Sequence, residues 1–211
     1  MPAFLFDLDG VIIHSMPLHA QAWEIYLRKH GIDPGDLQAA MHGRRNDAIV
    51  TAYWGDQISA DDNFRYGAEK EALFREMMTP VFEEYVIPGA REFVRSLAGP
   101  KGLGSNAERA NIEFTLERAG LSDAFDAIMD GNQVEHPKPY PDIYLALAER
   151  LQRKPKDCIV FEDSITGVAA ARAAGMRVVG VDSSRTGLEN VDLLVHDFQD
   201  MRLGPWLQGQ E

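Results

Sequence analysis

One stretch near the start of the chain decides its fold: Phe4-Leu5-Phe6-Asp7-Leu8-Asp9-Gly10-Val11-Ile12. An apolar run breaks there into two carboxylates one residue apart, followed by a glycine. Aspartate is a poor strand residue and is costly to bury. Two of them, placed where a buried strand should end, therefore indicate a cation site or a nucleophile. The alternative is an ordinary Asp-Gly turn after a strand, and the rest of the chain decides between the two.

The composition is that of a soluble globular protein, with 45% hydrophobic and 26% charged residues. A length of 211 residues allows one large domain, or one domain with a smaller insert. The formal net charge of −12 disfavours nucleic acid or an anionic membrane as a partner. The single cysteine, Cys158, excludes a disulfide framework, and no apolar run approaches the roughly 20 residues of a membrane span. We therefore expect a cytoplasmic protein without a signal peptide.

Short apolar runs alternate with helical patterns over most of the chain, which is typical of a parallel sheet covered on both faces. We predict an α/β doubly wound fold. The expected strands are 3–7, 101–104, 127–129, 158–161, 177–181 and 191–195. The expected helices of this part are about 88–97, 107–119, 141–151 and 165–174. The strand at 101–104 is a weak prediction because it contains Gly102 and Gly104.

Between about 15 and 84 the pattern is helical only, with expected helices near 15–29, 35–41, 46–54 and 60–78. This segment interrupts the α/β pattern just after its first strand. We therefore predict an inserted helical cap domain, residues 15–84, in a core domain made of residues 1–14 and 85–211.

Polar side chains follow four of the predicted strands, and the carboxyl ends of parallel strands meet at one edge of a sheet, where ligands bind. They comprise two carboxylates, a hydroxyl with an amide, a lysine in a proline-rich loop, and two more carboxylates: Asp7 and Asp9, Ser105 and Asn106, Lys138, and Glu162 and Asp163. Four separate loops would thus converge on one site.

This set of residues suits phosphoryl transfer. The carboxylates match the oxygen ligands that Mg²⁺ prefers. Ser105 and Asn106 precede a predicted helix, whose N-terminus favours a phosphate, and Lys138 offers positive charge to a developing anion. Of two aspartates spaced i, i+2, one can attack phosphorus, while the other protonates the leaving oxygen and later activates water.

The four motifs, in this order, resemble those of the haloacid dehalogenase-like hydrolase superfamily, in the subfamily with a small helical cap, near beta-phosphoglucomutase and its phosphatase relatives. The residues that carry the resemblance are Asp7-Leu8-Asp9-Gly10-Val11, Ser105, His136-Pro137-Lys138-Pro139 and Glu162-Asp163-Ser164, followed by Gly167. Two departures are the glycines of the second strand and His14, which stands where relatives carry an aspartate.

The resemblance implies a role for each motif residue. Asp7 would be the nucleophile and Asp9 the general acid/base, and Ser105 and Lys138 would bind the phosphoryl group. Mg²⁺ would be held by Asp7, the main-chain carbonyl of Asp9 and Asp163. Glu162 would be either a further ligand or a residue that supports the ligands.

The predicted cap offers further candidates for substrate binding. His19 and Trp23 lie four residues apart on one helix face, and they match a histidine and a tryptophan that border the active site in the mutase; a surface histidine and a core tryptophan are the alternatives. Lys70 matches a cap lysine of the mutase, although Glu69-Lys70-Glu71 also suits a solvated helix face.

The loop 43–47, with Arg44 and Arg45, suits bidentate phosphate contacts. The alternative for this segment is a solvated helix start with Asn46 as its cap.

We therefore expect a Mg²⁺-dependent phosphatase that acts on a small phosphorylated metabolite, such as a sugar phosphate, through a phosphoaspartate intermediate. The first alternative is a phosphomutase, which shares all four motifs and transfers the phosphoryl group to a sugar hydroxyl instead of water. The second is a non-enzymatic metabolite-binding protein, which the intact set of catalytic residues disfavours. We expect a monomer or weak dimer, with no nucleic acid and no membrane as partner.

Overall fold

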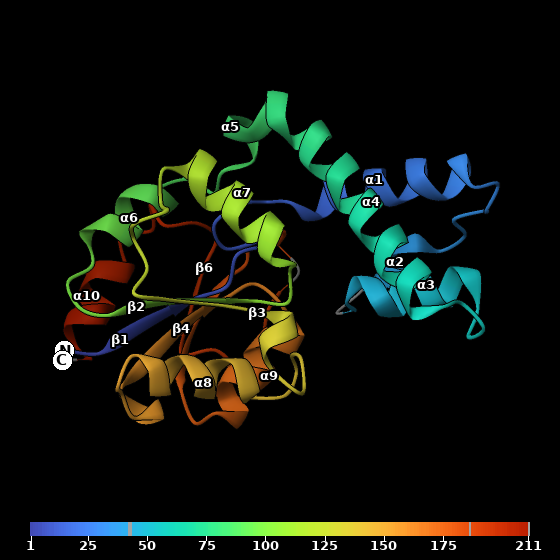
Figure 1. Ribbon diagram of the computed structural model, residues 1–211. Coiled ribbons are helices and arrows are strands. Elements are labelled where there is room, and N and C mark those ends of the chain that lie inside the picture. Colours follow the sequence, from blue (N-terminus) through green and yellow to red (C-terminus); the bar gives the residue numbers. More distant parts are fainter. Residues whose placement is uncertain (42–43, 186, 211) are drawn as a thin grey trace. The chain divides into compact units, whose positions relative to one another are not determined.

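The computed structural model describes residues 1–41, 44–185 and 187–210. The chain divides into two compact units, one formed by Met1–His14 with Tyr85–Glu211 and the other by Ser15–Glu84 (Figure 1). The first unit contains the sheet, and the second is built from helices. No helix in the described ranges is long and apolar enough to cross a membrane.

The described residues of the α/β unit form one six-stranded parallel sheet, in the order β3-β2-β1-β4-β5-β6. This is a doubly wound order, in which the strand sequence reverses beside β1. The predicted α/β architecture with a helical insertion is confirmed. The strands are β1 Ala3–Phe6, β2 Lys101–Ser105, β3 Ala127–Asp130, β4 Cys158–Glu162, β5 Arg177–Val181 and β6 Leu193–Val195.

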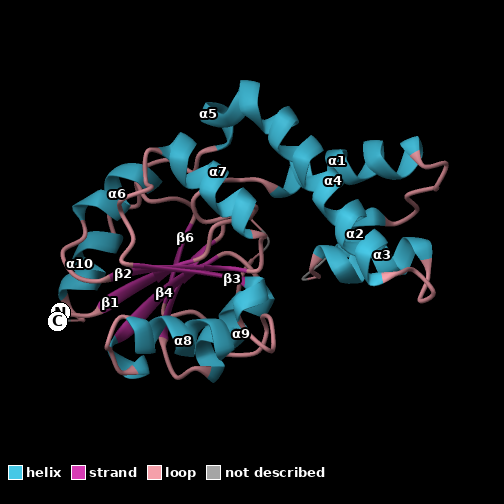
Figure 2. Cartoon of the chain, viewed as in Figure 1, coloured by secondary structure: helices cyan, strands magenta, loops and turns pink. Residues whose placement is uncertain are grey.

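Helices cover both faces of this sheet, with α8 and α9 on one face and α6 and α7 on the other (Figure 2). Side chains alternate between the faces of a strand. Leu5 and Val160 therefore pack with α8 and α9, while Phe6 and Phe161 stack on each other, with ring centroids 4.5 Å apart. The helices of this unit are α6 Ala90–Ser96, α7 Arg109–Ala119, α8 Asp142–Arg150, α9 Ile165–Ala173 and α10 Leu203–Gln208.

The weakly predicted second strand is present, and its two glycines have a packing reason. A Cβ on Gly104 would lie 2.8 Å from Leu147 Cδ1 and 3.3 Å from Ile143 Cγ1, both on α8. A Cβ on Gly102 would lie 3.0 Å from Leu5 Cδ2. The glycines thus give α8 the room to approach the sheet closely, which β-branched residues would not allow.

The segments that leave and re-enter the α/β unit lie side by side. The backbone N–H of His14 donates to the carbonyl of Tyr85 at 2.7 Å, and that of Ile87 donates to the carbonyl of Ile12 at 3.0 Å. An isolated antiparallel bridge joins Ile13 to Val86. The helical unit is therefore inserted between two backbone segments of the α/β unit that are hydrogen-bonded to each other.

The helical unit has its own core, formed by Trp23, Tyr26 and Leu27 of α1 with Ile49 and Val50 of α3. Buried apolar side chains from several helices give it an interior separate from that of the sheet. Its helices are α1 Met16–Lys29, α2 Leu37–Met41, α3 Asn46–Trp54 and α4 Ala60–Met78, after which the 3₁₀ turn Thr79–Val81 and α5 Phe82–Tyr85 lead back.

Candidate active site

Five polar residues lie at the carboxyl ends of strands β1 to β5. Ser105, Asp130 and Glu162 are the last residues of β2, β3 and β4, whereas Asp7 directly follows β1 and Asp182 directly follows β5. All five are buried. The predicted convergence on one sheet edge is therefore present for the strand-end residues, and Asp130 and Asp182 are additions that the sequence analysis did not single out.

Lys138 is the centre of the site. Its ammonium donates to Asp7 Oδ1 at 2.8 Å, to the carbonyl of Gly104 at 3.0 Å and to Glu162 Oε1 at 2.6 Å. The lysine is 5% exposed. An ammonium has three N–H donors and no acceptor, so these three contacts use its full hydrogen-bonding capacity. The loop between β3 and α8 thus delivers a buried positive charge to the ends of β1, β2 and β4.

Glu162 is fully buried, and both of its carboxylate oxygens accept hydrogen bonds. Oε1 receives the ammonium of Lys138 and the hydroxyl of Tyr144, each at 2.6 Å. Oε2 receives the backbone N–H groups of Asp163 and Ser164, at 3.1 and 3.2 Å, and the hydroxyl of Ser164. A Cβ on Gly167 would lie 1.8 Å from Glu162 Oε1. Only glycine at position 167 therefore leaves room for this carboxylate.

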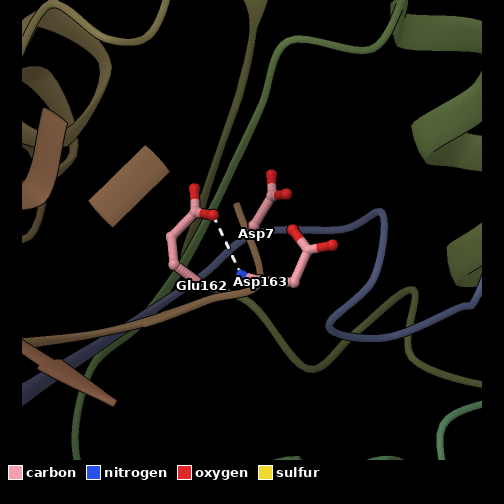
Figure 3. Close-up of side chains that lie close together, drawn as sticks. All are labelled: Asp7, Glu162 and Asp163. Atoms are coloured by element: carbon pink, nitrogen blue, oxygen red, sulfur yellow. Dashed lines mark hydrogen bonds between the residues drawn. The ribbon is translucent and has the colours of Figure 1, made fainter. Parts of the chain in front are cut away.

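A group of carboxylates at this edge has the chemistry of a metal site. Oxygens of Asp7, Glu162 and Asp163 all lie within 4.8 Å of one another (Figure 3). Gly10, with φ of 78°, makes this possible, because a Cβ there would lie 1.8 Å from Asp163 Oδ2. Three carboxylates lie close together here and one ammonium pairs with two of them, so the donor set fits a hard divalent cation that would balance the remaining negative charge.

Burial governs the ionisation of this group. It raises the pKa of Asp7 to about 7, with help from the charges of Glu162 and Asp9, although Lys138 opposes the shift. Burial, together with Glu162 and Asp7, also raises the pKa of Asp163 well above its usual range. For Lys138, burial alone would lower the pKa, but the carboxylates of Asp7 and Glu162 outweigh it and raise the pKa. The lysine therefore stays charged, whereas ionisation of the buried carboxylates of Asp7 and Asp163 costs free energy.

Asp9 lies in a tight turn that follows β1. The backbone N–H of Gly10 donates to the carbonyl of Ile13 at 2.7 Å, and that of Ile12 donates to the carbonyl of Leu8 at 2.8 Å. The side chain of Asp9 is half-buried. The hydroxyl of Ser183, just beyond β5, donates to the carbonyl of Gly10 at 3.0 Å and ties this turn to a second strand end.

Ser105 and Asn106 come directly after Gly104, whose carbonyl accepts the Lys138 ammonium, although α7 begins at Arg109, two residues later than predicted. The hydroxyl of Ser105 accepts the backbone N–H of Ala107 at 3.0 Å, and Asn106 Oδ1 accepts the backbone N–H of Lys138 at 3.4 Å. Asn106 therefore contacts the lysine loop directly.

The helical unit contains a second buried charged cluster. Lys70 is 1% exposed, and its ammonium donates to Glu71 Oε1 and lies 3.3 Å from His19 Nδ1. The Asn46 amide donates to the same Glu71 oxygen at 2.7 Å. The alternatives of a solvated face for Lys70 and a surface position for His19 are therefore wrong. So is the cap role for Asn46, because the N-cap of α3 is Arg45.

The other helical-unit candidates are placed as follows. Trp23 is fully buried in the core of this unit, as the core-packing alternative expects. Arg44 is exposed, and the guanidinium of Arg45 pairs with Asp47 at 2.7 Å. Gly43, the first residue of the predicted substrate loop, lies outside the described residues.

Sequence reasoning missed Tyr144, Ser164 as a hydrogen-bond donor, and Glu71. Tyr144 fell on the apolar face of a predicted helix and was indistinguishable from packing residues. The available signal was its type, because a buried tyrosine needs a partner for its hydroxyl. Glu71 was obscured by its charged neighbours.

Comparison with known proteins gives concordant matches. The family model of haloacid dehalogenase-like hydrolases matches residues 1–175. The chain is 35% identical to fructose-1-phosphate phosphatase YqaB of Escherichia coli (strain K12) over 181 residues, covering 84% of this chain and 94% of that protein.

Two further matches extend over nearly the whole chain. It is 29% identical to beta-phosphoglucomutase of Bacillus subtilis (strain 168), covering 96% and 92% of the two chains. The crystal structure of a HAD hydrolase of family IA, variant 3, from Entamoeba histolytica matches with a TM-score of 0.85 and 28% identity, covering 100% and 99%.

Proposed function

The chain belongs to the haloacid dehalogenase-like hydrolase family and is a phosphatase-like enzyme; we propose that it is a Mg²⁺-dependent phosphatase that hydrolyses a small sugar or polyol phosphate. The observation that carries the proposal is the buried ammonium of Lys138, 2.8 Å from Asp7 Oδ1, at the edge of a carboxylate group that fits a divalent cation. This arrangement supplies a nucleophile and the positive charge that a phosphoryl group requires. The similarity to a fructose-1-phosphate phosphatase supports a sugar phosphate as the substrate class.

The proposed cation ligands are side-chain oxygens of Asp7 and Asp163 with the main-chain carbonyl of Asp9. We assign Glu162 to support these ligands, because five hydrogen-bond donors already engage its two oxygens. Bound Mg²⁺ would neutralise charge on the phosphoryl oxygens and on the nearby carboxylates.

In the proposed first step, a carboxylate oxygen of Asp7 attacks phosphorus and the ester P–O bond breaks. Lys138 and the Ser105 hydroxyl hold the phosphoryl oxygens as negative charge shifts to the leaving group. Asp9, in its protonated form, transfers a proton to the leaving oxygen, so that the product is a neutral alcohol. Asp7 then carries the phosphoryl group as an acyl phosphate.

In the second step, the Asp9 carboxylate removes a proton from water, and the resulting hydroxide attacks the phosphorus of the acyl phosphate. Breakage of the bond between phosphorus and the Asp7 oxygen releases inorganic phosphate and regenerates both aspartates. Because Asp9 gives one proton to the leaving oxygen in the first step and takes one from water in the second, it ends the cycle in the protonated form in which it began.

We further propose that residues 15–84 act as a cap domain that supplies substrate specificity. The buried cluster of Lys70, Glu71, His19 and Asn46 is the strongest candidate for substrate binding within that unit, because contacts among these side chains hold each of them in a fixed position. Lys70 and His19 then remain substrate-binding candidates, with Arg44 and Arg45 as candidates for a phosphate at the cap surface. The single cysteine, buried in β4, fits a reducing compartment such as the cytoplasm.

The test is a panel of phosphate esters incubated with Mg²⁺, in which free phosphate and isomerised product are read together. A phosphatase releases stoichiometric phosphate from sugar or polyol phosphates. The similarity to beta-phosphoglucomutase makes a phosphomutase the second candidate. With hexose 1-phosphate and a trace of the bisphosphate, isomerisation without free phosphate would establish the mutase. Absence of turnover across the whole panel would overturn both and favour a binding protein.

A further inference from the structure

Tyr144 touches both partners of the central ion pair, although no motif of the family resemblance includes it. It lies in the first turn of α8, and its side chain is fully buried. Its hydroxyl donates to Glu162 Oε1 at 2.6 Å. The ammonium of Lys138 lies 4.9 Å from the centroid of its ring, within range of a cation–π interaction. Tyr144 therefore acts on Lys138 in two ways, directly through its ring and indirectly through Glu162, which pairs with that lysine.

We propose that Tyr144 is a positioning residue that sets how strongly Glu162 holds the Lys138 ammonium, and thereby how readily that ammonium is given to a phosphoryl oxygen. The inference rests on the proposed function only in assigning a phosphoryl ligand to Lys138.

Competition for the ammonium is the first part of the reason. Its three N–H groups already serve Asp7, Gly104 and Glu162, so a phosphoryl oxygen has to displace one of these acceptors. The carbonyl of Gly104 is neutral and belongs to a strand, and Asp7 is the proposed nucleophile. Glu162, at 2.6 Å, forms the shortest of the three contacts, and the strength of this contact decides what displacement costs.

The Tyr144 hydroxyl acts on this contact. Oxygen Oε1 of Glu162 accepts the phenol proton as well as the ammonium, so its negative charge is shared between two donors. Without the hydroxyl, Oε1 would be left to the ammonium alone in a fully buried position, where an ion pair strengthens because the local dielectric is low. Lys138 would then be drawn toward Glu162 and away from Asp7 and an incoming phosphoryl group.

The ring and the hydroxyl have separable roles. The ring packs among Ile143, Leu147 and Met129 in the core beside α8, and this packing function survives in phenylalanine. Burial and the nearby Glu162 raise the pKa of the Tyr144 hydroxyl well above its usual range, so the group remains a proton donor at every working pH. Tyr144→Phe is therefore a test of the hydroxyl with the packing retained.

The experiment compares Tyr144→Phe with a matched control, Tyr140→Phe, which removes a hydroxyl from an exposed tyrosine near the start of the same helix. We expect kcat to fall about tenfold or more in Tyr144→Phe, since hydrogen bonds to charged groups are worth that much. By calorimetry, affinity for inorganic phosphate should fall about tenfold in the same variant, while affinity for Mg²⁺ alone should change less than about threefold. The control should match the wild type in all three measurements.

Wild-type kcat and phosphate affinity in Tyr144→Phe would overturn the proposal. So would a parallel loss of phosphate affinity, Mg²⁺ affinity and Tm, because a merely structural role moves all three together. The phosphate titration also separates this inference from the proposed function. A wild-type protein that binds phosphate through Lys138 but turns over no ester refutes the phosphatase, while the ratio between wild type and variant still decides the role of Tyr144.

Discussion

Each unit of the molecule contains a buried lysine that lies over an aromatic ring and pairs with a buried glutamate. In the α/β unit, Lys138 lies 4.9 Å from the Tyr144 ring centroid and pairs with Glu162. In the helical unit, Lys70 lies 4.8 Å from the Trp23 ring and pairs with Glu71. The two clusters are alike in residue types and in burial, yet they differ in how the sequence builds them and in how their charges balance.

The difference in charge balance separates the two clusters chemically. Around Lys138, three carboxylates lie close together, those of Asp7, Glu162 and Asp163, and the one ammonium pairs with the first two. Burial and mutual repulsion raise the pKa values of Asp7 and Asp163. Around Lys70, the contacts seen among the described residues join the Glu71 carboxylate to one ammonium, an imidazole and an amide. A charge imbalance calls for a cation, whereas a balanced cluster does not. We therefore expect Mg²⁺ to act on the first cluster and not on the second.

The largest effect expected is from Asp7→Asn, which removes the proposed nucleophile. Turnover should fall at least about a thousandfold, as it does when an enzyme loses its nucleophile. The fold should persist, because Lys138 keeps Glu162 as a partner. Steady-state kinetics and a urea denaturation curve measure both. Phosphatase activity close to that of the wild type would refute the role of Asp7, and Glu71→Gln, which neutralises a carboxylate of the other cluster, is the control that should leave more activity.

Lys138→Met and Lys70→Met compare the clusters directly. The first variant leaves two carboxylates buried without their ammonium, so we expect a stability loss of about 3–5 kcal/mol and a loss of activity of at least about a hundredfold. The second leaves Glu71 with the Asn46 amide, and we expect a loss of about 1–3 kcal/mol. Urea denaturation gives both values.

Saturating Mg²⁺ sharpens this comparison. A cation that binds the folded state raises its stability, and it should restore part of the loss in Lys138→Met while leaving Lys70→Met unchanged. Equal responses of the two variants to Mg²⁺ would contradict the assignment of the cation site to the α/β unit.

Gly167→Ala tests whether the position of Glu162 matters by itself. The added methyl carbon would overlap the carboxylate, at 1.8 Å from Oε1, and so has to displace Glu162 from Lys138 and Tyr144. We expect activity to fall about tenfold and the protein to lose roughly 1–3 kcal/mol, the usual cost of overpacking. Gly204→Ala is the control, since nothing lies within 4 Å of a Cβ at that position. Wild-type kinetics in Gly167→Ala would show that the chain tolerates a displaced Glu162.

The smallest effect expected is a pH dependence confined to the first cluster. The pKa of Asp7 rises from 3.8 to about 7 on folding, so between these values the metal-free folded state holds a proton that the unfolded state has released. Stability of the metal-free protein should therefore decrease as pH rises through this window. A cation competes with that proton, so affinity for Mg²⁺ should weaken by up to about tenfold per pH unit below about pH 7.

Urea denaturation in a chelator, and Mg²⁺ titrations at several pH values, measure these two trends. In Asp7→Asn the contribution of this residue to both should disappear. A metal-free stability that instead rises with pH across the same window would show that the carboxylate is ionised more easily when folded, opposite to the sign expected here.

The two clusters also differ in how far sequence could predict them. The partners of Lys138 are far away in the chain, but the order of strands brings their ends together, and a motif at each strand end marks them. Lys70 sits between two glutamates, a pattern that local reasoning equally assigns to a solvated face. Its burial depends on contacts of α4 with α1 and α3, through His19 and Asn46, and these contacts are tertiary rather than periodic.

The same limit explains Tyr144 and the second strand. The order of elements and the motif residues followed from alternating patterns, because those patterns reflect burial in a parallel sheet. The hydrogen bond of Tyr144 to Glu162 depends on the depth at which α8 packs, which no periodicity encodes. In the same way, Gly102 and Gly104 weakened the strand prediction, although they are the reason that the helix fits against that strand.

The pair of glycines in β2 has a consequence for how tolerance to substitution should map onto this chain. Gly104 offers no functional group, yet its carbonyl accepts the Lys138 ammonium, and its missing side chain sets the depth of the helix that presents Tyr144. In a saturation mutagenesis screen scored by turnover, position 104 should therefore rank with the chemical residues, and compensating second-site changes should shorten Leu147 or Ile143. A residue without a side chain would then belong to the active site by virtue of the space it leaves empty.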